Sequence, residues 1–128
     1  LDCRPANITI LVQMNLRLVQ KRKSPIPRVS DDDAAGLADI FRLLGDPSRL
    51  RILLACLGAP TSVGEIASRV GLSGSLVSHH LRLLRAARLV RARRDGKQVF
   101  YDGADEHVRC VIADMIVHAG EARDEDED

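Results

Sequence analysis

The chain's strongest constraint on its fold is a run of helix-start signals that follow one another between residues 46 and 73. Asp46 is an N-cap residue followed by a proline, which is favoured at the first helical position. Ser62 stands three residues before Glu65, which is the spacing of a capping box, and Ser73 can cap a third helix. Three helices are therefore predicted: from Pro47 to a stop at Gly58-Ala59-Pro60, from Ser62 through Val70, and from Ser73 to about Ala87.

A hairpin signal follows these helices. Two β-type stretches, residues 89–94 and 97–101, are joined by Asp95-Gly96, which is a strong two-residue turn signal. The turn Gly71-Leu72-Ser73 has the length and the glycine of a helix-turn-helix. With helices predicted over 33–44 and 104–121, the fold class is α+β, mostly α: a winged helix-turn-helix with a two-stranded hairpin wing and a C-terminal dimerisation helix.

The chain has 128 residues, of which 45% are apolar, and this suits one compact domain. We expect residues 33–121 to form the winged helix-turn-helix DNA-binding and dimerisation domain. Residues 1–32 are expected to be a mobile basic arm, of which residues 1–13 precede the first methionine and are expected to be non-native. Residues 122–128 are expected to be a disordered acidic tail.

Composition excludes several classes of protein. Two phenylalanines, one tyrosine and no tryptophan are too few for the aromatic platforms that stack single-stranded nucleic acid. No apolar run approaches the roughly 20 residues of a membrane span, so we expect no membrane partner. Three cysteines without a Cys-x-x-Cys spacing favour a reducing, cytoplasmic location.

The formal net charge of +1 conceals a strong segregation of charge along the chain. Residues 71–101 hold seven basic residues and one acidic residue, and residues 1–30 hold six and one. Residues 102–128 hold ten acidic residues and two basic ones. The predicted helix-turn-helix and wing are therefore positive and suited to DNA phosphates, whereas the C-terminal block is expected to lie away from DNA.

The helix predicted from Ser73 to Ala87 has two different faces when it is projected at 100° per residue. Its polar arc carries hydroxyls and an imidazole first and arginines later, which suits base edges and phosphates respectively; a plain solvated face is the alternative. His80 lies in the apolar arc, so we expect it to be packed and hydrogen-bonded. With the basic residues of the hairpin, the candidate DNA contacts are Ser73, Ser75, Ser78, His79, Arg82, Arg85, Arg91, Arg93, Arg94 and Lys97.

The predicted last helix carries metal-ligand residue types at Asp105, His107, His118 and Glu121. These nitrogen and oxygen donors suit zinc or cobalt. The two histidines are eleven residues apart, about 16.5 Å along one helix, so one ion cannot bind both in the same chain. Two antiparallel copies related by a two-fold axis near Ala113 would bring Asp105 and His107 to the partner's His118 and Glu121, giving a homodimer with two equivalent sites. Taken singly, each residue also has an ordinary interpretation as a helix-start acid, a surface histidine or the start of the acidic tail.

From Leu37 to Glu121 the sequence resembles the ArsR/SmtB metalloregulators, specifically their zinc-sensing SmtB branch. The resembling segments are GDPSRLRILLACL, VGEIASRVGLSGSLVSHHLRLLRAARLV and RRDGKQVFY. The resemblance implies a dimeric repressor that is released from double-stranded operator DNA when zinc binds on the C-terminal helix, with cobalt or cadmium as substitutes and nickel less suited. It also implies a hydrogen bond from the second ring nitrogen of His118 to a carbonyl near Arg88. The family's second, cysteine-containing site is not expected, because residues 61–64 read Thr-Ser-Val-Gly.

Three other functions have distinct tests. A thiol-responsive repressor of the same fold would use Cys56 and Cys110, and those cysteines would label quickly. A constitutive DNA-binding module would bind DNA independently of zinc. A zinc hydrolase would need an open coordination position, and the sequence has neither a Gly-x-Ser-x-Gly nor a His-Glu-x-x-His motif. We therefore expect no enzyme activity and no small-molecule substrate.

Overall fold

The computed structural model describes residues 26–126 of the chain. Contacts divide the chain into two units, one ending at Leu37 and one from Ala38 onward. In the first unit, the Ser30 hydroxyl accepts from the Asp33 amide at 3.1 Å, and the Asp33 carboxylate accepts from the Ser30 hydroxyl at 2.8 Å. This reciprocal cap begins helix α2 (Asp31–Leu44), two residues before the predicted start and therefore inside the segment expected to be an arm. The rest of the expected arm, residues 1–25, lies outside the described residues.

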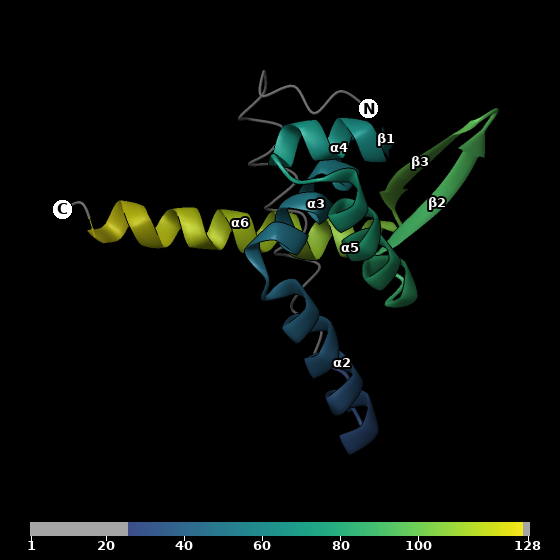
Figure 1. Ribbon diagram of the computed structural model, residues 1–128. Helices are drawn as coiled ribbons and strands as arrows, with labels where there is room; N and C mark the ends of the chain where they lie inside the picture. The colour runs from purple at the N-terminus through teal and green to yellow at the C-terminus, as the bar shows by residue number, and fades with distance from the viewer. Residues whose placement is uncertain (1–25, 127–128) are drawn as a thin grey trace. The chain divides into compact units, whose positions relative to one another are not determined.

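The three predicted caps begin the next three helices (Figure 1). The Asp46 carboxylate accepts from the Ser48 amide at 2.9 Å, and the Ser62 and Ser73 hydroxyls accept from amides three residues ahead. Gly71 ends the second of these helices in the left-handed conformation, at φ 70°, where a side chain would be strained. The helices are α3 (Pro47–Gly58), α4 (Val63–Val70) and α5 (Gly74–Ala86).

The core forms where α3, α4 and α5 meet. From α5 it takes Val77, Leu81 and Leu84, as the apolar arc predicted. Leu76 and Leu83 of the same helix are exposed and half-buried respectively, because they lie at the edge of the buried face. The buried apolar residues are Ile52, Leu53, Cys56, Leu57, Ile66, Val70, Val77, Leu81, Leu84, Leu89 and Val90.

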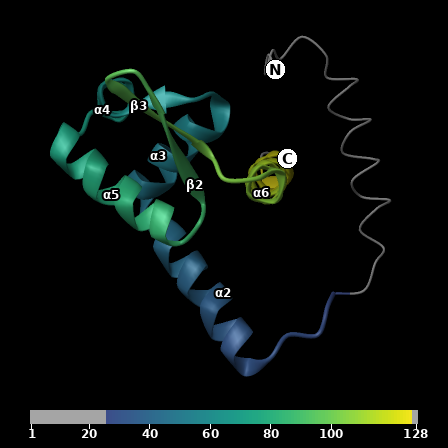
Figure 2. The same ribbon diagram turned by 90° about the vertical axis from the view of Figure 1, so that its right-hand side faces the viewer.

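The wing, whose two strands are labelled in Figure 2, is the largest part of a three-stranded antiparallel sheet in which β3 lies between β2 and the short strand β1 (Thr61–Ser62). Its strands are β2 (Val90–Asp95) and β3 (Gln98–Gly103). Asp95 pairs with Gln98, so the two-residue loop is Gly96-Lys97 and not the predicted Asp95-Gly96. The reason is that Gly96, at φ 64°, supplies the positive φ that a hairpin loop needs at its first position, and this leaves Asp95 in the strand.

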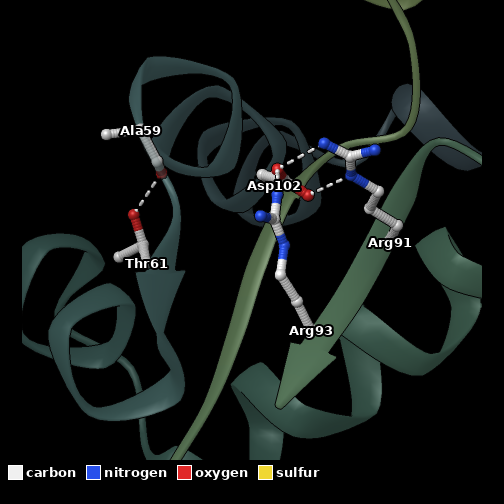
Figure 3. Close-up of polar contacts among 5 residues, drawn as sticks. All are labelled: Ala59, Thr61, Arg91, Arg93 and Asp102. Carbon is white, nitrogen blue, oxygen red and sulfur yellow. Dashed lines mark hydrogen bonds and ion pairs between the residues drawn. The ribbon is translucent and has the colours of Figure 1, made fainter. Parts of the chain in front are cut away.

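The third strand, β1 (Thr61–Ser62), is too short to leave a periodic signal and was not predicted. It pairs with Tyr101 and Phe100 of β3. The buried Thr61 hydroxyl donates to the Ala59 carbonyl at 2.6 Å, which satisfies its polar group inside the core (Figure 3). The wing is therefore attached to the segment between α3 and α4 as well as to α5.

The last helix, α6 (Glu106–Asp126), begins two residues after the predicted start. It also runs beyond the predicted end, so residues 122–126 are helical where we expected disorder. Val108 and Ile112 pack against the core, but three other apolar side chains of α6 are exposed by 50–56%: Val111, Met115 and Ile116. Among the described residues, no helix is long and apolar enough to cross a membrane.

His80 is 6% exposed and hydrogen-bonded, as predicted. Its Nδ1 accepts from Arg49 Nε at 3.3 Å, which requires an unprotonated nitrogen. Arg49 also donates from Nη1 to the Leu43 carbonyl at 2.9 Å and lies 3.9 Å from the Asp46 carboxylate. This network connects α5 to the end of α2 and the start of α3.

The neutral imidazole of His80 makes the fold sensitive to acid. Burial, and next the charge of Arg49, lower the pKa of His80 below its usual 6.5. The unfolded chain takes up a proton at this histidine as the pH falls through 6.5, whereas the folded chain does so only at lower pH. The free energy of unfolding should therefore fall below pH 6.5. Urea unfolding at pH 7.5 and pH 5.5 measures this loss, which should be smaller in His80→Gln than in the parent or in the exposed-site control His107→Gln.

Candidate nucleic-acid interface and metal ligands

The outward arc of α5 matches the prediction with one difference. Ser75, His79, Arg82 and Arg85 are exposed and Ser78 is half-buried. The Ser73 hydroxyl, also a candidate DNA contact, forms the predicted helix cap and accepts from the Leu76 amide at 3.2 Å. Among the described residues, none of the exposed four has an ion-pair partner within the chain. The N-terminal half of α5 thus presents hydroxyls and an imidazole, and its C-terminal half presents two cations.

The four basic residues of the wing fall into two pairs. Arg94 and Lys97 are exposed near the tip and have no ion-pair partner among the described residues. Arg91 and Arg93 instead converge on one carboxylate, that of Asp102 (Figure 3). The distances are 2.8 Å from Arg91 Nε, 3.0 Å from Arg91 Nη2 and 3.1 Å from Arg93 Nη2.

The sequence analysis did not identify Asp102 as the partner of two candidate DNA contacts, Arg91 and Arg93. It was counted with the acidic C-terminal block, away from DNA, but it lies in β3 of the wing. The hydrogen bond from Arg91 and the charges of both arginines hold the pKa of Asp102 below its usual range, against the effect of burial. With the predicted Asp95-Gly96 loop, Asp102 would have been placed opposite Leu89, so its pairing with Arg91 follows only from the observed Gly96-Lys97 loop.

Asp105 caps α6, as its ordinary interpretation predicts. Its Oδ1 accepts from the Val108 amide at 3.0 Å. His107, His118 and Glu121 are exposed on the same helix. At 100° per residue, His118 lies about 20° from His107 around the axis and Glu121 about 40° from it, so the three share one face.

A single chain does not bring the four candidate ligands together. Their spread along α6 agrees with this, and no group of three or more potential ligands occurs among residues 26–126. The donor set nevertheless suits zinc, because it combines two imidazoles with two carboxylates at the solvent-exposed surface. His118 has no hydrogen-bond partner among the described residues, so the implied bond to a carbonyl near Arg88 is not formed in the single chain.

The cysteines do not have the environment of a reactive pair. Cys56 is fully buried in the core, and burial, with a smaller effect of the Asp102 charge, raises its pKa to about 12. Cys110 is half-buried on α6. Because the thiolate is the reactive form, Cys56 is poorly suited to sensing thiols or oxidants.

A capped short helix, a glycine turn, an exposed second helix and a basic hairpin define a winged helix-turn-helix DNA-binding protein. The sequence model described as "Bacterial regulatory protein, arsR family" matches residues 46–92. The chain belongs to this family, the ArsR/SmtB family of transcriptional regulators, and its relatives are DNA-binding regulators and not enzymes.

Two curated relatives support this assignment. The HTH-type transcriptional regulator KmtR of Mycobacterium tuberculosis is 41% identical over 98 residues, covering 77% of this chain and 73% of the relative. The transcriptional repressor SmtB homolog of Synechocystis is 36% identical over 121 residues, covering 94% and 92%. Among solved structures, the homodimeric winged helix-turn-helix domain of Mb0332 from Mycobacterium bovis matches with a TM-score of 0.69 and 30% identity, over 78% of this chain and 95% of that one.

Cys56 should resist alkylation in the folded protein. At a fixed pH below 9, raising the pKa from 9.0 to about 12 lowers the thiolate fraction roughly a thousandfold, and burial slows access further. Iodoacetamide labelling followed by peptide mass spectrometry should therefore modify Cys110 well before Cys56, and urea should remove the difference. The variant Cys56→Ala serves as the assignment control. Rapid labelling of both cysteines would restore the thiol-sensor hypothesis.

Proposed function

We propose that the protein is a metal-responsive transcriptional repressor that binds operator DNA as a metal-free homodimer and is released when zinc binds. The observation that carries this proposal is the placement of His107 and His118 on one exposed face of α6, with carboxylates beside both. Such a role implies a cytoplasmic location.

The exposed apolar side chains of α6 support dimerisation. Val111 and Met115 lie next to the histidine face, and both are at least half exposed in the single chain. Covering them with a second copy of α6 would remove apolar area from water, at about 25 cal/mol per Å². The stripe formed by His107, Val111, Met115, His118 and Glu121 repeats every three or four residues, which suits a seam between two antiparallel helices. The homodimeric relative Mb0332 is consistent with this arrangement.

In such a dimer, the Asp105 and His107 of one chain would hold the ion with His118 and Glu121 of its mate. When bound, zinc would supply a tetrahedral crosslink between the two protomers. Both histidines must be neutral to act as ligands, so protons compete with the metal and its affinity is expected to fall in acid. Cobalt and cadmium fit the same donor set, whereas nickel would need more ligands.

The DNA-binding surface would be the outward face of α5 together with the wing. Ser75, Ser78 and His79 would reach base edges in the major groove, while Arg82, Arg85 and the wing cations would contact phosphates. Two recognition helices of a dimer would fit half-sites about 34–36 Å apart. In the metal-bound dimer the helices would fit the grooves less well, so metal and DNA would oppose each other reciprocally.

The coupling can be tested with a duplex selected from a random pool by the metal-free protein. Fluorescence anisotropy should show zinc weakening binding by about 5–150-fold, the range of 1–3 kcal/mol couplings. His118→Ala should retain DNA binding and lose the zinc effect, because it removes a ligand and leaves α5 unchanged. Glu106→Gln, an exposed acid of α6 outside the candidate set, should respond as the parent does. Zinc-independent binding by the parent would instead favour the constitutive module.

The ligand set can be tested by cobalt(II) absorption. The dimer should give the intense visible bands of tetrahedral coordination, and His107→Ala and His118→Ala should each lose them. Glu106→Gln should keep them. An octahedral spectrum, or one unchanged in both histidine variants, would contradict the assigned site.

A further inference from the structure

The wing carries an anion that already binds two of its own DNA-facing cations. We propose that Asp102 is an affinity-limiting residue: its carboxylate occupies Arg91 and Arg93 as an internal competitor for backbone phosphate, and so weakens the sequence-independent part of DNA binding. This inference rests on the proposed DNA-binding function and names the residue that regulates it.

The strand register sets this arrangement. Arg91 of β2 pairs directly with Asp102 of β3, and Arg93 lies two residues further along the same face. Arg91 donates from Nε and Nη2 to the two separate oxygens, a bidentate arrangement, and Arg93 adds a third hydrogen bond to Oδ2 (Figure 3). Three arginine donors are therefore directed at one carboxylate.

Carboxylate and phosphate are the two anions that a guanidinium binds in this forked geometry. The Nε and Nη2 donors of Arg91 cannot hold both anions in the same way at one time. A phosphate that approaches the wing must either use the remaining donors or displace Asp102. Each alternative weakens the contact compared with an unpaired arginine.

The arrangement is open enough for this competition to occur. The Arg91 and Arg93 side chains are 57% and 63% exposed, whereas the Asp102 side chain beneath them is 14% exposed. Exposed ion pairs are weak, so they can exchange partners. The group of three carries a local charge of +1, where two arginines alone would carry +2. Arg94 and Lys97 provide a comparison, because they have no such partner among the described residues.

Asp102→Asn tests the proposal by fluorescence anisotropy with a random-sequence duplex between 50 and 300 mM KCl. The variant should bind about three- to eightfold more tightly near 0.1 M salt. The slope of the logarithm of the association constant against the logarithm of the KCl concentration should steepen by about 0.9 for each additional phosphate contacted. The affinity for the duplex selected from the random pool should rise by a similar factor, because phosphate contacts carry no sequence information.

Asp95→Asn is the matched control. It makes the same change in charge in the same hairpin, but Asp95 has no arginine partner among the described residues. Its slope should stay close to that of the parent, so a general charge effect is separated from the release of arginines. In the background Arg91→Gln/Arg93→Gln, Asp102→Asn should give no gain.

A second comparison leaves Asp102 in place, in case Asp102→Asn fails to fold by circular dichroism. Arg94→Gln should flatten the salt slope more than Arg91→Gln does, because Arg91 is already occupied. A folded Asp102→Asn with unchanged or weaker binding, or equal effects of the two arginine variants, would overturn the inference. Failure of the parent to bind any duplex would overturn the proposed function instead.

Discussion

The burial of one face of α5 against α3 and α4 is the interaction on which the rest of the structure depends. Val77, Leu81 and Leu84 anchor that face, and His80 adds a hydrogen bond from Arg49. Once these side chains are inside, the rotation of α5 about its axis is fixed, and so is the set of residues that it presents to a ligand. Burying three such aliphatic side chains contributes several kcal/mol, at about 1.5–3 kcal/mol each. The outward position of the polar residues of α5 is thus a consequence of core packing.

Features encoded locally were predictable from the sequence. The caps at Asp46, Ser62 and Ser73 act within their own first turns, so short-range chemistry is sufficient to locate the helix starts. The inward position of His80 followed from helical spacing. Features that depend on distant partners were missed. Thr61 forms a strand only because β3 lies beside it, and the role of Asp102 is set by a pairing partner eleven residues away. The candidate metal residues were found from their spacing, and the ordinary interpretation of Asp105 as a helix-start acid agrees with the cap that it forms.

The C-terminal helix α6 leaves apolar side chains exposed in the single chain. Val108 and Ile112 cover the core, while apolar side chains on other sides of α6 face outward beside two exposed histidines. A surface helix of a monomeric protein usually has one buried apolar face and one solvated polar face. The outward mixture of valine, methionine and imidazole is instead what a helix needs when a second surface supplies both apolar cover and further ligands. Dimerisation and metal binding would then use the same side chains, so the site would exist only in the assembled protein.

The two-residue loop at the tip of the wing has an effect well beyond the turn. Gly96 takes the first loop position, which makes Asp95 the last paired residue of β2 and sets every partner below it. If the loop formed one residue earlier, at Asp95-Gly96, every cross-strand partner would shift by two residues, and Asp102 would pair with Leu89. Asp102 would then lie two residues further from Arg91 and from Arg93 along the ladder, too far to hold both guanidinium groups. The backbone freedom of one glycine thus determines whether two cations at the base of the hairpin are neutralised internally or left to the solvent.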